Sequence, residues 1–482
     1  MSRPAGPLAA LGRLGWRRLA DPWRTAARAQ LREEESAFAL AALGVRLPLG
    51  PGQAPPADPA AAAEVLAAGL SAALGREPAT RCRLAWRGPV PRVVAHEPAD
   101  ILLALDDGIE LRLDERVPAP GLPARLRSAL DAAVLAELPA IAELPASRRG
   151  APLERRVAAA LARSAPRGER RAGRAYLRRL LAATVLTVEA PAGDPVGLPS
   201  QHPVLPLAHN LLEVRARLRP GLTHADLWMR AIHVAIDGAP VQDVLERLKE
   251  SWGAEPLRLP GPAALRGGEE RVCSQHRGDE AVLATLGLLD LARVFELRAR
   301  AAAAGVELPF AGAVAWALAA HPDLAGEAIA IPVDLPANDH RSRSLSLAVV
   351  RPADFGTSGL AAYAAAFAAE LAAARGETNA VAGALRAAAL VPTPLLARVP
   401  VTPGRRAAVA GTAGVSVAAR SDVFVPAIND AYRWYLGLGN AAIPAAGGGT
   451  VGAVVLKCRR ADLPRIARAV DEALRPEAVP SR

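Results

Sequence analysis

The chain has 482 residues, of which 51% are hydrophobic and only 4% aromatic, and 58 Lys and Arg against 48 Asp and Glu give it a net charge of +10. This length is too great for one ordinary domain and suits two, each with its own core. The basic residues are scattered, and their densest run, 167–179, is typical of a solvated helix face, so we do not expect nucleic acid as a partner; a phosphorylated small ligand fits the charge equally well.

Cysteine usage and hydropathy indicate the compartment. Cys82, Cys273 and Cys458 are far apart and form no metal-binding or disulfide pattern, so we expect a reducing environment and no metal. No window reaches about 18 uninterrupted apolar residues, which predicts a soluble cytoplasmic protein without a transmembrane segment. Residues 16–18 favour an edge helix over contact with a membrane surface. The abundance of Ala, Arg and Pro suggests a GC-rich bacterial genome.

The first half contains alternating helical and strand patterns. Residues 1–57 form a predicted N-terminal extension with a helix over 21–43, and the Pro/Gly-rich segment 48–59 follows it. Helices are then predicted at 60–75, 122–138 (before Pro139), 155–165, 171–181 and 240–252, and strands at 83–86, 92–95, 101–105, 109–113, 184–189, 208–218 and 227–236. The turn at 106–108 predicts that two of these strands form a hairpin.

The second half repeats this plan after a predicted linker at 254–284. Helices are predicted at 289–303, 310–320, 360–375, 380–396 and 461–474, and strands at 327–333, 344–350, 414–417, 431–437 and 451–457. The shared order indicates an internal duplication, with the first repeat at 58–253 and the second at 285–476. We therefore predict an α/β fold (an α+β two-layer sandwich) of two tandem units, in which helices cover mixed sheets.

The strongest chemical signal is a His-x-x-x-Asp-Gly turn between a strand and a helix, formed by His233, Asp237 and Gly238. A buried neutral imidazole can accept a proton from a thiol or alcohol that attacks a thioester. Asp237 suits a turn held by an arginine. Gly238 allows a sharp bend, and we include it as a candidate substrate-binding residue. The oxyanion that develops needs a hydrogen-bond donor, for which a hydroxyl from the other half is the natural candidate.

The other histidines are weaker candidates. His202 and His209 precede the motif and are candidates for lining a tunnel, while His340 fits a polar loop. The end of the second repeat, Lys457-Cys-Arg-Arg-Ala-Asp, has no histidine. One repeat therefore retains the chemistry and the other does not.

The motif resembles the signature of the coenzyme-A-dependent acyltransferase superfamily. This superfamily includes chloramphenicol acetyltransferase, the catalytic domains of 2-oxoacid dehydrogenase acyltransferases, condensation domains, and wax ester synthase/diacylglycerol acyltransferases. Residues 62–130, Gly414-Val-Ser416-Val and the segments 424–430 and 435–439 extend the resemblance. It implies two chloramphenicol-acetyltransferase-like units with a tunnel between them, His233 as general base, Asp237 as structural carboxylate and Ser416 as oxyanion donor.

The resemblance also implies an activity. We expect a coenzyme-A-dependent acyltransferase that moves an acyl group from a thioester to a thiol, alcohol or amine, with coenzyme A thioester as substrate and no covalently bound cofactor. An acyl carrier protein and a second copy of the chain are candidate partners. No lipoyl domain is visible, which argues against a conventional role in a dehydrogenase complex. The alternative is a catalytically degenerate paralogue that acts as a scaffold or binding protein.

Overall fold

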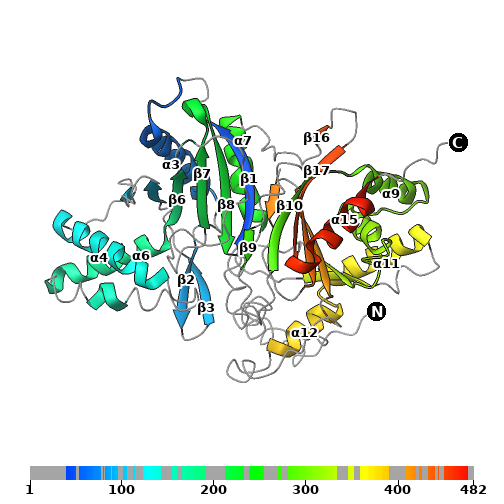
Figure 1. The fold of residues 1–482 in the computed structure, drawn as a ribbon. Coiled ribbons are helices and arrows are strands. Elements are labelled where there is room, and N and C mark those ends of the chain that lie inside the picture. Colours follow the sequence, from blue (N-terminus) through cyan, green and yellow to red (C-terminus); the bar gives the residue numbers. More distant parts are fainter. Residues whose placement is uncertain are drawn as a thin grey trace, which may run out of the picture.

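A computed structural model shows two mixed β-sheets, each covered by helices (Figure 1). This confirms the predicted fold class. The structure describes residues 40–49, 54–77, 80, 82–87, 90–95, 101–105, 112–113, 123–142, 155–159, 166–189, 191, 212–232, 238–253, 270–272, 281–333, 346–351, 359–389, 409, 411–418, 423–425, 432–439, 443–444 and 450–475.

The first sheet has seven strands in the order β14-β1-β8-β7-β6-β4-β5. Its strands are β1 (Leu40–Pro48), β4 (Ile101–Leu105), β5 (Arg112–Leu113), β6 (Thr184–Glu189), β7 (Leu212–Leu218), β8 (His224–Ile232) and β14 (Val423–Val425). β4 pairs antiparallel with β5, as the predicted hairpin requires.

The second sheet has eight strands, with the main order β12-β11-β13-β15-β17-β10-β9 and β16 paired to β17. Its strands are β9 (Glu270–Val272), β10 (Ala281–Asp290), β11 (Ile329–Val333), β12 (Ser346–Val350), β13 (Ala413–Ala418), β15 (Trp434–Gly439), β16 (Ile443–Pro444) and β17 (Thr450–Arg459).

The two sheets have the same topology. Reading the second sheet as β10-β17-β15-β13-β11-β12 matches β1-β8-β7-β6-β4-β5 strand for strand. The directions agree as well: the first two pairs and the last are antiparallel, and the two pairs between them are parallel. Such agreement in order and direction supports the predicted internal duplication.

In the first half, the core forms where α3 (Pro59–Gly75) and α7 (Gly238–Trp252) pack on the sheet. The Asp58 side chain caps α3 by accepting a hydrogen bond of 2.8 Å from the Ala61 N–H. Alternate strand residues such as Leu227 and Met229 point into this core, as the two-residue period of a strand requires.

Further helices of the first half are α4 (Ala124–Ala142) and α6 (Arg167–Ala182), which contact each other, and β2 (Cys82–Arg87) pairs with β3 (Val90–Ala95) as a separate ribbon. Tyr176 on α6 donates a hydrogen bond of 2.8 Å to Asp131 on α4. Burial raises the pKa of Asp131, and burial together with this bond raises the pKa of Tyr176 well above its ordinary value. The bond therefore holds the two helices together.

In the second half, the core lies under α9 (Ala292–Ala303), α10 (Phe310–Ala319), α11 (Gly359–Arg375) and α15 (Leu463–Leu474). Figure 1 shows α9, α11 and α15 on the side of the second sheet away from the first sheet. The other face of the second sheet, which we call the inner face, carries a smaller cluster with α12 (Ala380–Ala389). The inner face is therefore directed toward the first half.

Three segments differ from the sequence-based expectation. β1 occupies 40–48, where we predicted the end of a helix and an extension outside the first repeat. β9 and the start of β10 lie within the predicted linker 254–284, and the end of β10 lies where a helix from 289 was predicted. Both long strands pair with partners far along the chain, β8 and β17, so tertiary pairing overrides their weak local pattern. α4 also runs on past Pro139, where we predicted its end; only the last turn of the helix follows this proline.

Substituting alanine for Gly69 tests the packing of α3 against α7. A Cβ at Gly69 would lie 2.0 Å from Cζ2 of Trp252, so the indole would have to move. We expect the free energy of unfolding to fall by about 1–3 kcal/mol, because overpacking outweighs the gain of about 1 kcal/mol that alanine brings to a helix. Urea unfolding followed by circular dichroism measures the change. Gly75→Ala, at the open end of the same helix, is the control and should retain full stability.

Candidate functional site

The predicted catalytic turn lies between two described elements. β8 ends at Ile232 and α7 begins at Gly238, which confirms the predicted strand and helix on either side of the turn. His233 and Asp237 themselves lie outside the described residues, as do His202, His209 and His340.

The second half contains the same strand and helix without the histidine. β17 leads into α15 through the short 3-10 helix Arg460–Asp462, in the segment Lys457-Cys-Arg-Arg-Ala-Asp that has no histidine. Cys458 is 1% exposed and packs in the core of the second half. The end of the last strand in the second half therefore carries a buried thiol and no histidine.

Ser416 lies on the inner face of the second sheet. Its neighbours on β13, Ala413 and Val415, point into the helix-covered core, so the alternation of the strand turns Ser416 the other way. Its side chain is half-buried. Its partner in the register of the parallel strand β15 is Gly437, which has no side chain to cover the hydroxyl.

Tyr435 is the most direct neighbour of Ser416. Its ring lies over Gly414, where an added Cβ would be 2.3 Å from the ring carbons, and its hydroxyl hydrogen-bonds Ser416. Burial, and secondarily the nearby Tyr432, raises the pKa of Tyr435 far above its ordinary value, although the bond to Ser416 acts in the opposite direction. The phenol therefore stays protonated, and because the bond to Ser416 lowers its pKa, the Ser416 hydroxyl donates that bond to the phenol oxygen.

Sequence reasoning missed the role of Tyr435 and Gly437. Both lie in the segment 435–439, which the sequence had already marked as part of the resemblance. The missing information was the parallel register of β13 and β15, which sets Tyr435 beside Gly414 and Gly437 beside Ser416.

The crossover strand β14 links the two halves. It follows β13 in the chain, yet it pairs with β1 at the edge of the first sheet. Ala42 of β1 pairs with Val425 on one side and with Arg230 of β8 on the other, so β14 lies two strand spacings, roughly 10 Å, from the end of β8. β14 also lies close to β13, β15 and β17. The edge of the first sheet near the end of β8 is thus held against the second sheet.

Ser416 is tied to this crossing by a short length of chain. Val423 is seven positions further along the chain, a span of at most about 25 Å even if fully extended. Because β13 also contacts β14 directly, the strand that carries Ser416 lies near the strand end that precedes His233.

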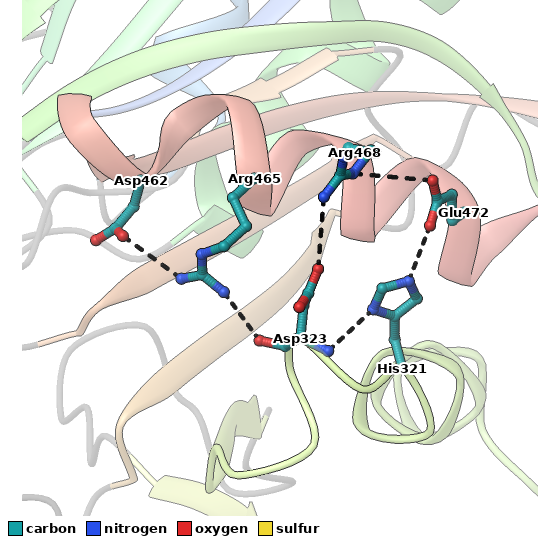
Figure 2. Close-up of polar contacts among 6 residues, drawn as sticks. All are labelled: His321, Asp323, Asp462, Arg465, Arg468 and Glu472. Carbon is teal, nitrogen blue, oxygen red and sulfur yellow. Dashed lines mark hydrogen bonds and ion pairs between the residues drawn. The ribbon is translucent and has the colours of Figure 1, made fainter.

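The histidines within the described residues have other contacts. His224 begins β8, at the end opposite His233, and its Nδ1 lies 3.0 Å from the Thr223 hydroxyl. His321 joins α10 to α15 through a 3.1 Å contact with Glu472, in a network that includes Asp323 and Arg468 (Figure 2). This network is partly exposed and fixes the terminal helix of the second half, so we assign it a structural role.

Metal and membrane features are absent from the part of the chain that the structure describes. No group of three or more His, Cys, Asp or Glu there could hold a metal ion. No helix in the same part combines the length and apolar character that crossing a bilayer requires.

Among known proteins, the chain is similar to several solved structures. No protein-family model and no curated protein matches the chain. The condensation domain of the Monacolin K polyketide synthase MokA is 12% identical, with a TM-score of 0.45, and the match covers 94% of this chain and 95% of that one. TRI101 from F. graminearum, solved with coenzyme A and deoxynivalenol, is 12% identical, with a TM-score of 0.43, over 91% of this chain and 96% of that one.

A single-unit enzyme matches part of the chain. Dihydrolipoamide acetyltransferase from Azotobacter vinelandii is 17% identical, with a TM-score of 0.27, over 41% of this chain and 82% of its own. The solved structures similar to the chain thus include the protein classes that the His233 motif resembles.

Proposed function

We propose that the protein is an acyltransferase that moves an acyl group from a coenzyme A or carrier-bound thioester to a thiol, alcohol or amine. The observation that carries the proposal is the crossover strand β14, which brings the strand of Ser416 and the end of β8 into one region. His233 directly follows β8 in the sequence. A base and a hydroxyl donor on opposite sides of a substrate are what direct acyl transfer needs.

The proposed reaction proceeds without a covalent enzyme intermediate. His233 accepts the proton of the acceptor as its oxygen, sulfur or nitrogen forms a bond to the thioester carbonyl carbon. The Ser416 hydroxyl donates a hydrogen bond to the oxyanion of the tetrahedral intermediate. The carbon–sulfur bond then breaks, and the proton passes from His233 to the departing thiolate. Asp237 and Gly238 hold the turn.

Tyr435 supports the proposed role of Ser416. The bond to the phenol oxygen holds the Ser416 side chain in place, and in the reaction the serine O–H turns from the phenol oxygen to the substrate oxyanion. Gly437 beside Ser416 leaves room for an acyl carbonyl.

The activity is tested by incubating the purified protein with a panel of acyl-coenzyme A donors of different chain length and with mixed acceptors. Free thiol release and mass spectrometry of the products report transfer. We expect acyl products with at least one donor and acceptor pair. If no pair gives product above the uncatalysed rate, the alternative of a degenerate scaffold or binding protein replaces this proposal.

Replacing Tyr435 by phenylalanine should lower kcat about tenfold, because the loss of one hydrogen bond leaves the Ser416 hydroxyl free to rotate. The ring still covers Gly414, so the melting temperature should change little. Steady-state kinetics on the preferred donor measures the effect. Tyr432→Phe is the matched control, since its ring lies against Tyr435 with centroids 5.3 Å apart. Equal kcat in wild type and Tyr435→Phe would remove Tyr435 from the proposed site.

A further inference from the structure

The first sheet has a polar face on the side opposite α3 and α7. Its side chains alternate with the core residues of β6, β7 and β8. Thr187 of β6 pairs with Arg215 of β7, which pairs with Trp228 of β8, so these three form one row across the sheet. The next row consists of Glu189, Arg217, Asp226 and Arg46.

Both carboxylates of the second row form ion pairs with more than one arginine. Glu189 forms ion pairs with both Arg215 and Arg217, the latter at 3.0 Å. Asp226, which is fully buried, forms ion pairs with Arg46 at 2.7 Å and with a further arginine, Arg219, at 2.9 Å. Each carboxylate therefore has two guanidinium partners. Glu213, which is 3% exposed, adds a further carboxylate on the same face of β7.

Two buried donor atoms in the first row have no hydrogen-bond partner among the described residues. Thr187 is 5% exposed, and its Oγ1 atom finds no hydrogen-bond partner among the described residues. The same holds for the buried Nε atom of Arg215, whose guanidinium is otherwise held by Glu189. A buried polar group without a partner costs about 1–3 kcal/mol. Two such groups on adjacent strands indicate a place where a ligand supplies the missing acceptors.

The duplication shows that this arrangement is particular to the first half. Matching β4 with β11 and β6 with β13 places Thr187 where the second sheet has Ser416, and Arg215 where it has Gly437. In the second half the hydroxyl is bonded by Tyr435 and lies beside a glycine. In the first half the hydroxyl is unpaired and lies beside an arginine. The two equivalent places therefore suit ligands of different chemistry.

We propose that Thr187 and Arg215 bind the oxyanion group, carboxylate or phosphate, of a small ligand on the polar face of the first sheet. The Thr187 hydroxyl and the Arg215 Nε–H donate to its oxygens, and the buried ring of Trp228 (4% exposed) closes the row beside them. Arg215, whose side chain is 21% exposed, gives access from solvent. An oxyanion fits better than a neutral group because a hydrogen bond from a guanidinium to an anion is charge-assisted. The proposal is independent of the activity assigned to His233.

The probes are sodium acetate and sodium phosphate, each compared with sodium chloride at equal ionic strength. We expect one of the two to raise the melting temperature of the full-length protein with a saturable concentration dependence, as mass action requires of a ligand that binds the folded state. The more effective anion distinguishes a carboxylate from a phosphate ligand. A crystal structure in that anion should show it within hydrogen-bond distance of Thr187 Oγ1 and Arg215 Nε.

Variants link the effect to these atoms. Thr187→Val and Arg215→Lys should each weaken the apparent affinity about tenfold or more, because each removes one donor to a charged ligand. Thr184→Val removes a buried hydroxyl on the other face of the same strand, and Arg217→Lys alters the same Glu189 pair, so both controls should keep wild-type affinity. Melting temperatures in chloride verify that every variant is folded.

Two outcomes would overturn the proposal. One is a crystal structure in which only a water molecule joins Thr187 and Arg215 at saturating anion, since buried water commonly satisfies such groups. The other is an anion-dependent stabilisation that Thr187→Val and Arg215→Lys leave unchanged, or no stabilisation by either anion.

Discussion

Replacing His233 by alanine is expected to lower acyl transfer about a hundredfold to ten-thousandfold, the usual contribution of a positioned general base. The imidazole is the proposed acceptor of the proton that the attacking group loses. Asp237 is the one other titratable residue in the sequence from 233 to 237. The effect should appear in kcat, measured as free thiol release with a saturating acyl-coenzyme A donor. The KM of the donor should change much less, because the base acts on the acceptor.

The matched control is His224→Ala, on the same strand but at the opposite end. His224 contacts Thr223 and is expected to have no part in the reaction, so its removal should leave kcat unchanged. Circular dichroism and the melting temperature must agree between the two variants. If His233→Ala retains wild-type turnover with the fold intact, the assignment of the general base is wrong.

Most elements of the fold are predictable from the sequence because their patterns are local. α15 has clear helical periodicity, α3 and α10 are longer runs of small and apolar residues typical of buried helices, and β4, β6 and β11 are short apolar runs between turn signals. β1 and β10 are different: the segments Leu40–Pro48 and Ala281–Asp290 contain small residues that suit a helix or a strand. Their conformation is set by pairing with β8 and β17, roughly 180 residues away in the chain.

The candidate site, like the fold, could be predicted from the sequence only in part. The strand and helix around the His233 turn follow from local pattern, and the serine-bearing strand follows from the resemblance. The neighbours of Ser416 do not, because they depend on which residue of β15 lies beside which residue of β13. The crossover of β14 into the first sheet is also invisible in the sequence, since a strand of three residues has no pattern of its own. Both features arise from tertiary packing.

Replacing Ser416 by alanine is expected to lower kcat about a hundredfold to a thousandfold, the loss measured when one oxyanion donor is removed from an enzyme. The hydroxyl stabilises charge that exists only in the tetrahedral intermediate, so the donor KM should stay close to that of the wild type. Ser416 is half-buried and bonded to Tyr435, so a small loss of stability is expected as well, and melting temperatures separate this from the kinetic effect.

Ser416→Thr is the matched control, because it keeps a hydroxyl on the same Cβ and should retain more activity than alanine. Removing the Tyr435 hydroxyl from the Ser416→Ala protein should then cost little more, since Tyr435 is proposed to act only through the serine. A double variant whose kcat falls by the product of the two single effects would contradict that link.

The pair His233 and Ser416 gives the most demanding test of a single site built from both halves. Base and oxyanion donor serve the same transition state, so the double alanine variant should be much less impaired than the product of the two single losses. Residual turnover near the more severe single variant is the expected result, measured with the same donor and acceptor. Strictly multiplicative losses would indicate two independent effects, and the crossover of β14 would then serve only to join the two sheets.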